Sequence, residues 1–235
     1  MEALVDRSTP VPVVSKPVTV WRGRHASRVA WIGLAGFGAT FALVKARLSD
    51  AVDLAMTIKL QRRSHHVVDG ALRAVSWPGF PPQSRLIPAV ITAGLLVGRL
   101  RLEAACFVMA WGTALLATGA KALMNRPRPV AGKDLRVVAA PLGGSSFPSG
   151  HVLTYVGVYG FLAYLCYVLL PKGLGRQFGI AGLLGLVGLV GPSRIQQGHH
   201  WLTDVVASYM LGTSYVIGVA ALYRRRKART TWVDA

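Results

Sequence analysis

Six apolar blocks separated by polar segments dominate this sequence of 235 residues. Apolar residues make up 52% of the chain, more than in a typical soluble domain, and they occur in continuous runs instead of helical stripes. Runs of this length are typical of helices that cross a bilayer. We therefore expect an all-α integral membrane bundle of six transmembrane helices, with blocks at 29–44, 86–98, 102–120, 150–170, 178–192 and 203–223.

The segments around these blocks divide the chain into three predicted regions. Residues 1–28 form a polar N-terminal arm, 29–223 a membrane domain, and 224–235 a basic C-terminal tail. Between the first two blocks, residues 45–85 mix charged residues with apolar residues at helical spacing, which predicts an interfacial amphipathic helix before the second span. The prolines at 77–82 predict a turn at the level of the lipid head groups.

The charge pattern favours a lipid surface over nucleic acid. The net charge is +18, and the basic residues flank the apolar blocks, which suits anionic lipid head groups. We expect no nucleic-acid partner, and the sequence does not predict an oligomeric state.

Basic residues also suggest an orientation in the cell (plasma) membrane. Arginine and lysine in the short loops at 99–101 and 172–176, and in the tail, place both termini in the cytoplasm. This orientation puts the polar segments that follow the third and fifth blocks on the outer face. Residues 45–85 carry as many basic residues as the inner segments, so the orientation depends on the short loops and the tail alone.

The first polar segment pairs two cations around a helix end. Lys121 ends the third block, and Pro127 and Pro129 break the helix, so that Arg128 can fold back toward Lys121. Two cations held together are suited to binding an anion. The alternative interpretation is a basic helix end that extends toward lipid phosphates.

The second polar segment opens the fourth block. Ser149 is a candidate N-cap, Gly150 permits close approach of the backbone, and His151 projects from the first helical turn. Unpaired N–H groups at a helix N-terminus favour a phosphate. The alternative is a simple cap followed by an interfacial histidine.

The third polar segment precedes the sixth block. His200 and Asp204 are four residues apart, so a helix that begins here places them on one face. A carboxylate can fix the imidazole tautomer and make the other ring nitrogen a better nucleophile. An unpaired Asp204 at the start of a span is costly, and His200 is its expected partner. Arg194 supplies a third cation, whereas His199 points elsewhere and is expected to be structural.

The sequence predicts neither a metal nor a cofactor. Cys106 and Cys166 lie inside apolar blocks and cannot form a thiolate metal site. Divalent metal sites need clusters of carboxylates or histidines, and of the nine acidic residues only Asp134 and Asp204 fall in the polar segments. Lys121, Arg128 and Arg194 can neutralise a phosphate instead.

The fifth block carries a glycine at every third residue. In membranes, small residues let helices approach closely, so we expect these positions to pack against a neighbouring helix. A phosphate-binding glycine loop is excluded because no strand precedes the block. The positions are Gly179, Gly182, Gly185, Gly188 and Gly191.

Together the three polar segments resemble the signature of the type 2 phosphatidic acid phosphatase family, which is related to vanadium haloperoxidases and bacterial acid phosphatases. The pattern Lys-x6-Arg-Pro, Pro-Ser-Gly-His and Ser-Arg-x5-His-x3-Asp occurs at 121–129, 148–151 and 193–204 without departure. Outside 121–204, the hydrophobic layout and the segment at 45–85 resemble the six-helix membrane members of the family.

The resemblance implies a metal-independent membrane phosphatase that forms a phosphohistidine. His200 is similar to the family's nucleophile, Asp204 orients it, and His151 is the general acid. The phosphoryl oxygens would be held by Lys121, Arg128, Ser149, Gly150 and Arg194. The substrate class is a lipid phosphate or diphosphate, such as phosphatidate, phosphatidylglycerophosphate or polyprenyl diphosphate.

Three alternatives share part of this pattern. A lipid phosphotransferase would use the same residues and pass the phosphoryl group to another lipid. A non-catalytic lipid-binding protein needs neither nucleophile nor acid, so the presence of His151, His200 and Asp204 argues against it. A vanadate-dependent oxidase is disfavoured, because the oxidases that resemble this family are soluble.

Overall fold

Residues 23–62, 65–132, 135–137 and 143–233 are described by the computed structural model of the chain. All regular elements within them are helical, which confirms the all-α class. In chain order they are α1 (Gly23–Lys45), α2 (Asp50–Arg62), α3 (His66–Ser76), the 3-10 turn η1 (Trp77–Gly79), α4 (Gln83–Val97), α5 (Arg101–Trp111), α6 (Thr113–Met124), α7 (Gly150–Tyr155), the π-helical segment η2 (Val156–Gly160), α8 (Phe161–Leu169), α9 (Leu174–Gln196) and α10 (Leu202–Val233).

The first and last helices extend into the predicted N-terminal arm and the predicted C-terminal tail. Residues 1–22 of the predicted N-terminal arm and 234–235 of the tail lie outside the described residues. Helix α1 begins at Gly23, and α10 continues through the basic tail to Val233.

Five helical stretches of the described chain are long and apolar enough to cross a membrane, and the chain is an integral membrane protein. They are His25–Lys45, Arg101–Met124, Gly150–Leu169, Leu174–Gln196 and Leu202–Arg229. The predicted block at 86–98 forms α4, whose 15 residues extend only about 22 Å against a hydrocarbon core of about 30 Å. Five of the six predicted spans therefore have the required length.

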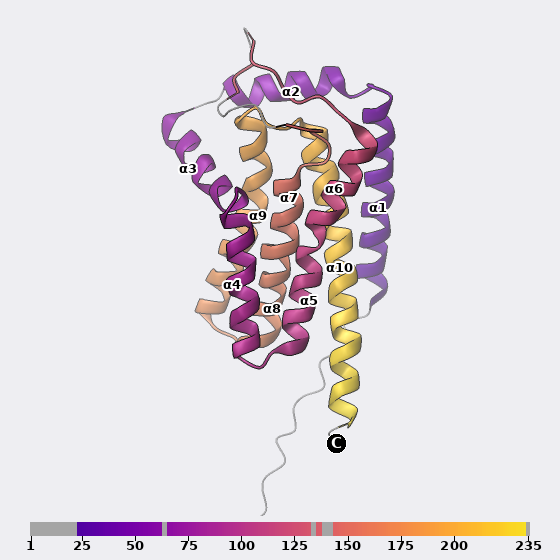
Figure 1. Ribbon diagram of the computed structural model, residues 1–235, viewed down its shortest axis with the longest axis vertical. Helices are drawn as coiled ribbons and strands as arrows, with labels where there is room; N and C mark the ends of the chain where they lie inside the picture. The colour runs from indigo at the N-terminus through magenta and orange to yellow at the C-terminus, as the bar shows by residue number, and fades with distance from the viewer. Residues whose placement is uncertain (1–22, 63–64, 133–134, 138–142, 234–235) are drawn as a thin grey trace, which may run out of the picture.

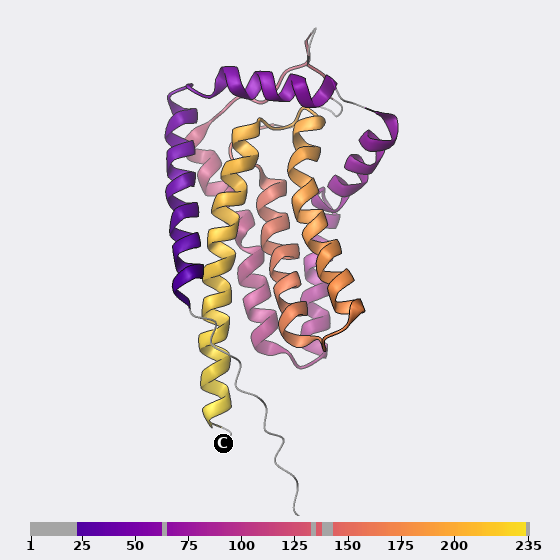
Figure 2. The same cartoon turned by 180° about the vertical axis from the view of Figure 1, so that it is seen from behind.

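The long helices run side by side, and α2 lies across one end of the bundle (Figure 1). The start of α1, the C-terminal end of α10, and the turns α4–α5 and α8–α9 lie at the opposite end. Seen from behind, α10 lies between α1 and the central helices (Figure 2). The polar segments that follow α6, precede α7 and follow α9 therefore gather at the end covered by α2.

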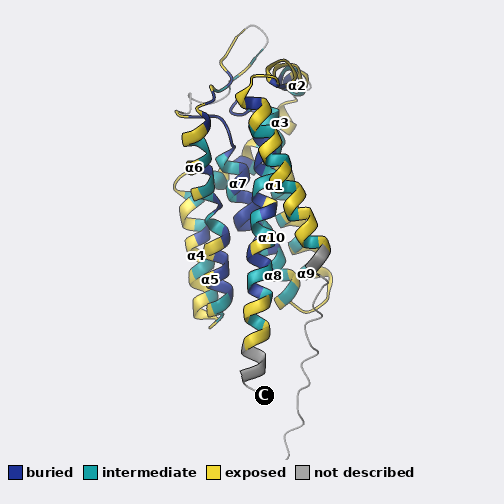
Figure 3. Ribbon diagram, turned by 90° about the vertical axis from the view of Figure 1, so that its right-hand side faces the viewer, coloured by how far each residue is buried: buried dark blue, intermediate teal, exposed yellow. Residues whose placement is uncertain are grey.

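The central span consists of α7, η2 and α8, where Figure 3 shows the deepest burial. Val152, Tyr155 and Phe161 are fully buried there and belong to a core shared with α5, α9 and α10. The outer helices α1 and α4 expose most of their residues. Apolar side chains such as Trp31 and Ile32, each 71% exposed, suit contact with lipid instead of a protein core.

A small aromatic cluster anchors the chain just before α7. Phe147 is fully buried, and its ring lies 5.9 Å from that of Phe37 and 5.8 Å from that of Phe41, both on α1. Aromatic pairs at such distances are worth roughly 0.5–1.5 kcal/mol beyond their burial. The cluster fixes the position of the following Pro-Ser-Gly-His segment.

The predicted interfacial segment at 45–85 forms two helices, α2 and α3, followed by η1. The face of α2 that packs on the bundle is polar, because its buried residues are Asp53, Thr57 and Gln61. Apolar side chains such as Val52 are exposed on it. The predicted break at 77–82 is confirmed, since η1 ends the α3 helix and α4 begins at Gln83.

The glycines of α9 pack less than their spacing predicted. A Cβ atom on Gly179, Gly182, Gly185 or Gly188 would meet no atom within 4 Å. Only the last of the series is crowded, since a Cβ on Gly191 would lie 2.6 Å from Val205 and 2.7 Å from the Tyr209 hydroxyl. The expectation of close packing along the whole stripe is therefore wrong, because a side chain at the other four positions would meet no neighbouring atom.

Gly157 of η2 is the position where a methyl group is least tolerable in the central span. A Cβ there would lie 2.3 Å from the Ala110 carbonyl oxygen and 2.3 Å from Thr113 Oγ1, both on the neighbouring span. We predict that Gly157→Ala destabilises the protein by about 1–3 kcal/mol, because the two spans must separate. Thermal unfolding in detergent measures the effect.

The matched control is Gly160→Ala, in the same π-helical segment, where a Cβ would meet no atom within 4 Å. This variant is expected to unfold within a degree or two of wild type. Equal behaviour of the two variants would contradict the packing argument.

Candidate active site

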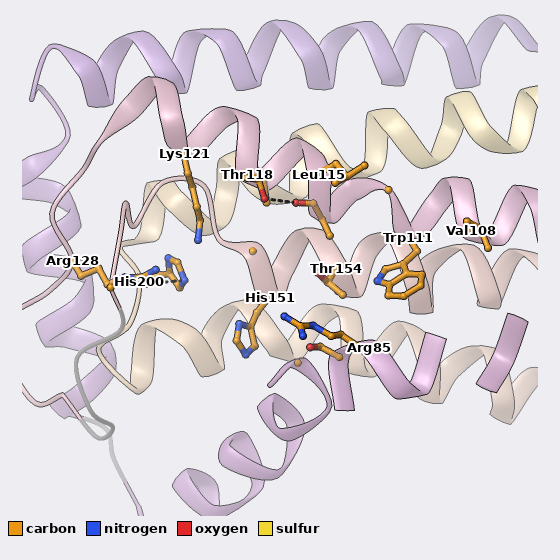
Figure 4. Close-up of a pocket in the computed structure, with 17 residues that line it drawn as sticks. Arg85, Val108, Trp111, Leu115, Thr118, Lys121, Arg128, His151, Thr154 and His200 are labelled. Atoms are coloured by element: carbon orange, nitrogen blue, oxygen red, sulfur yellow. Dashed lines mark hydrogen bonds between the residues drawn. The ribbon is translucent and has the colours of Figure 1, made fainter. Parts of the chain in front are cut away.

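A cavity of about 670 Å³ opens beside α7 at the end of the bundle near α2. Figure 4 shows His200 and Arg128 at one end, His151 in the middle and Trp111 toward the other end. Five of the predicted site residues line it, namely Lys121, Arg128, Gly150, His151 and His200. The remaining lining residues are Gly79, Ser84, Arg85, Val108, Trp111, Gly112, Ala114, Leu115, Ala117, Thr118, Gly143 and Thr154.

The first polar segment folds back as its prolines predicted. Asn125 ends α6 in a left-handed conformation, and the chain that follows brings Arg128 to the cavity. Arg128 Nη1 donates to the His199 carbonyl oxygen at 2.8 Å and lies 3.3 Å from His200 Nε2. Lys121 reaches the same space from α6, because its Nζ would lie 3.8 Å from a Cβ on Gly150.

The second polar segment starts α7 with Ser149 at the N-cap position. Ser149 makes no side-chain capping bond; its N–H donates to Ser208 Oγ at 2.8 Å, and its own Oγ is buried without a partner among the described residues. His151 follows on the first turn, and its Nε2 is likewise buried and unpaired within the described chain. His151 lines the cavity, whereas Ser149 is not among its lining residues; an unpaired imidazole nitrogen beside a cavity suits a polar ligand.

His151 is held in place by the turn before α4. The rings of His151 and Phe80 meet edge to face with centroids 4.6 Å apart. Gly79 is required beside them, because a Cβ at this position would lie 2.3 Å from His151 Cδ2. The turn at 77–82, which was predicted to lie at the lipid head groups, packs against His151. In the sequence, the Pro-Gly-Phe-Pro run predicts that the chain turns here, but it does not show that the turn contacts His151.

His200 and Asp204 meet, but not on a helix face. Helix α10 begins at Leu202, so His200 lies in the preceding turn. The distance from His200 Nδ1 to Asp204 Oδ2 is 3.5 Å, at the outer limit for a hydrogen bond. The shorter contacts of Asp204 are with the Trp201 N–H at 2.9 Å and with Arg126 Nη1 at 2.7 Å. His200 therefore lies next to Asp204 as expected, but Arg126 is the closer partner of this carboxylate.

Burial keeps His200 neutral. Its side chain is 2% exposed, and this burial lowers the pKa to about 4, although the neighbouring Asp204 carboxylate acts in the opposite direction. The positive charges of Arg128 and Arg194 lower the pKa further. At neutral pH the imidazole is uncharged, so one ring nitrogen carries a free lone pair. Nε2 lies beside Arg128, which lines the cavity.

Arg194 lies behind the cavity lining. Its guanidinium stacks over the Phe80 ring at 5.0 Å from the centroid and contacts Gln197, Ser76 and His199. Burial lowers the pKa of His199 to about 3, so this imidazole is neutral and can accept from Arg194. The contact agrees with the structural role expected for His199. Arg194 Nε remains buried and unpaired in the described part of the chain.

Arg126 is a site residue that the sequence patterns did not indicate. Its Nη1 donates to Asp204 Oδ1 and its Nη2 to Asp53 Oδ2, both at 2.7 Å. Asp53 of α2 also accepts the Thr203 N–H at 2.9 Å. The guanidinium thus joins α2, the loop after α6 and the start of α10. The available signal was a second Arg-Pro pair directly before Arg128.

The described residues include no group of three or more His, Cys, Asp or Glu side chains placed to hold a metal ion. Asp134, one of the two acidic residues noted in the polar segments, lies outside the described residues. The groups that line the cavity include three cations (Arg85, Lys121 and Arg128), two histidines and backbone or hydroxyl donors. Such a set is suited to an anion.

Comparison with known proteins gives a family and two related folds. The family model of the PAP2 superfamily matches residues 101–228. The first transmembrane PAP2 type phosphatidylglycerolphosphate phosphatase from Bacillus subtilis is 22% identical, with a TM-score of 0.72 over 82% of this chain and 94% of that one. Aquifex aeolicus LpxE is 20% identical, with a TM-score of 0.57 over 72% of this chain and 95% of that one. A search of curated proteins gives no significant match.

We predict that Arg126→Gln destabilises the protein by about 3–5 kcal/mol, because it leaves two buried carboxylates without their cation. Denaturant or thermal unfolding in detergent measures the loss. Arg101→Gln, at an exposed position, is the control and should change stability by less than about 0.5 kcal/mol.

A double variant measures how much of the loss comes from the ion pair between Arg126 and Asp53 itself. Asp53→Asn combined with Arg126→Gln is expected to lose less than the sum of the two single losses, because the residues are in direct contact. Additive losses, or an Arg126→Gln variant as stable as wild type, would show that the pair does not support the site.

Proposed function

The chain belongs to the PAP2 superfamily and is a membrane phosphatase, and from this premise we propose that it hydrolyses a lipid phosphate or diphosphate through a phosphohistidine. The observation that carries the proposal is the convergence of a neutral His200, His151, Lys121 and Arg128 on one cavity with apolar walls. A phosphatidylglycerophosphate phosphatase among the similar folds supports the lipid class.

In the proposed first step, His200 Nε2 attacks the phosphorus. The N–P bond forms while the bond from phosphorus to the leaving oxygen breaks, and His151 donates a proton to that oxygen. In the second step His151 accepts a proton from water, whose oxygen attacks the phosphorus. The N–P bond then breaks, and inorganic phosphate leaves with His200 regenerated. Asp204 supports the charge that develops on His200.

Phosphoryl oxygens need several fixed donors, because phosphoryl transfer depends on positioning and charge stabilisation. We assign this role to Lys121, Arg128, the hydroxyl of Ser149 and the backbone at Gly150. Arg194 completes the set through its unpaired Nε. These cations neutralise the phosphate without a metal, so we propose a metal-independent reaction with no cofactor.

We propose that α4 is the sixth span. It is short by itself, but η1 and α3 precede it on the same side of the bundle and lengthen the path through the membrane (Figure 1). Six spans place both termini on one side, and the basic loops at 99–101 and 172–176 favour the cytoplasm for that side. The site then opens on the outer face of the plasma membrane, within a membrane domain at 29–223 flanked by the arm at 1–28 and the tail at 224–235.

We predict that His200→Asn reduces phosphate release from lipid phosphates by at least about a thousandfold, because the nucleophile is lost. Release is measured with purified protein on phosphatidate, phosphatidylglycerophosphate and a polyprenyl diphosphate, with and without EDTA. His66→Asn, at an exposed position, is the control and should keep wild-type activity.

Two outcomes count against the proposal. If His200→Asn kept nearly full activity, His200 would not be the nucleophile. Loss of wild-type activity in EDTA, restored by added magnesium, would overturn the metal-free mechanism.

The low pKa of His200, about 4, also predicts the pH below which the reaction rate falls, which is the acid limb of the pH–rate profile. The nucleophile is neutral above this value, so protonation of His200 should lower the rate about tenfold per pH unit below about pH 4. Because the Asp204 carboxylate raises the His200 pKa, Asp204→Asn should move the limb to lower pH while slowing the reaction. Single-turnover rates across pH measure both effects, and a limb centred near pH 6.5 would contradict the prediction.

A further inference from the structure

The cavity continues past the two histidines along an apolar wall. Val108 and Trp111 of α5 and Leu115 of α6 line this part, and Figure 4 shows them on the side away from His200. Leu115 is 76% exposed at the surface of the bundle. A lipid whose phosphate lies at His200 can therefore extend its chains past Trp111 toward the surrounding bilayer.

Arg85 is a cation on this otherwise apolar path. It lies on the first turn of α4 and lines the same cavity as His151 and Thr154. Figure 4 shows its guanidinium beside His151, on the side away from His200 and Arg128. Arg85 is not part of any of the three polar segments singled out from the sequence.

The depth of Arg85 makes an unpaired charge costly. Along α4 it lies 12 residues before Val97, which is about 18 Å of helix. Arg99 and Arg101 follow Val97 and mark the membrane surface at that end. With α4 as the proposed sixth span and a hydrocarbon core about 30 Å thick, Arg85, whose side chain is exposed in the structure, lies within the depth of that core. Ionisable residues at such depth usually have a functional partner.

The protein supplies no such partner in its described part. The Arg85 guanidinium makes no hydrogen bond or ion pair with a described residue, and no acidic side chain lines the cavity there. The nearest charged groups in the cavity are Lys121 and Arg128, which carry the same sign. The partner of Arg85 is therefore an anionic group of the ligand.

Building on the proposed function, we propose that Arg85 binds a second phosphate group of the substrate, next to the scissile one. His151 marks the position of the leaving oxygen, and Arg85 faces whatever that oxygen carries. A lipid diphosphate places a phosphate there directly, and phosphatidylglycerophosphate places a phosphodiester there after a glycerol. Phosphatidate offers only glycerol esters. The preferred substrate thus carries two phosphate groups.

The test compares Arg85→Gln with wild type on three substrates. The ratio of kcat/KM for a two-phosphate lipid to that for phosphatidate should fall by about 10- to 100-fold, because a charge-assisted hydrogen bond is lost. Farnesyl diphosphate and phosphatidylglycerophosphate are assayed separately, and the larger fall identifies which spacing of the phosphates fits Arg85. Arg101→Gln, at the far end of the α4–α5 turn, is the control and should leave all ratios unchanged.

A binding assay separates this proposal from the proposed function. Inorganic pyrophosphate should raise the thermal unfolding temperature of wild-type protein more than orthophosphate does, and Arg85→Gln should abolish that difference. Wild-type protein that hydrolyses no lipid phosphate would overturn the proposed function, whereas the preference for pyrophosphate would still support Arg85. Equal falls in kcat/KM on all three lipids, or equal stabilisation by the two anions, would overturn the Arg85 assignment.

Discussion

A buried carboxylate at the start of the last span constrains the whole site. Asp204 is fully buried, and an unpaired charge in such a place costs several kcal/mol. Arg126 neutralises it at 2.7 Å and is itself held by Asp53 of α2. This arrangement fixes the loop after α6 against α2 and α10 at once. Arg128 follows Arg126 by two residues and His200 precedes Asp204 by four, so the same ion pairs place the proposed phosphate-binding cation beside the proposed nucleophile.

Residues next to helix boundaries were the predictable part of this site. Lys121 near the end of α6, Ser149 at the N-cap of α7 and Asp204 on the first turn of α10 are each marked by a nearby proline, glycine or apolar block. Arg126 was not predictable, because its partners lie 73 and 78 residues away in the sequence. Only the packing of α2 across the bundle brings Asp53 to it, and no local pattern encodes that contact.

Small residues show the same limit of local inference. The glycine spacing in α9 predicted packing, but only at Gly191 would an added Cβ atom meet another helix, since spacing gives the face of a helix and not its neighbour. Gly79 lies in a turn that the prolines predicted correctly, yet its importance comes from His151, 72 residues later, which fills the space that a Cβ would take. Likewise, the sequence shows α4 as an apolar block, and the proposed role of Arg85 on its first turn follows only from the cavity that this residue lines.

The unpaired atoms around the cavity share one electrostatic explanation. The Asp204 carboxylate forms its short ion pair with Arg126, and no acidic side chain among the described residues lines the cavity beside Lys121 and Arg128. Arg128 Nε, Ser149 Oγ and His151 Nε2 are buried without a partner in the described chain. Burying donors and cations in this way is unfavourable for the protein alone, and a phosphate would satisfy all of them together. Burial, with a smaller contribution from the positive charges of Arg128 and Arg194, keeps His200 neutral, which is the state that a nucleophile requires.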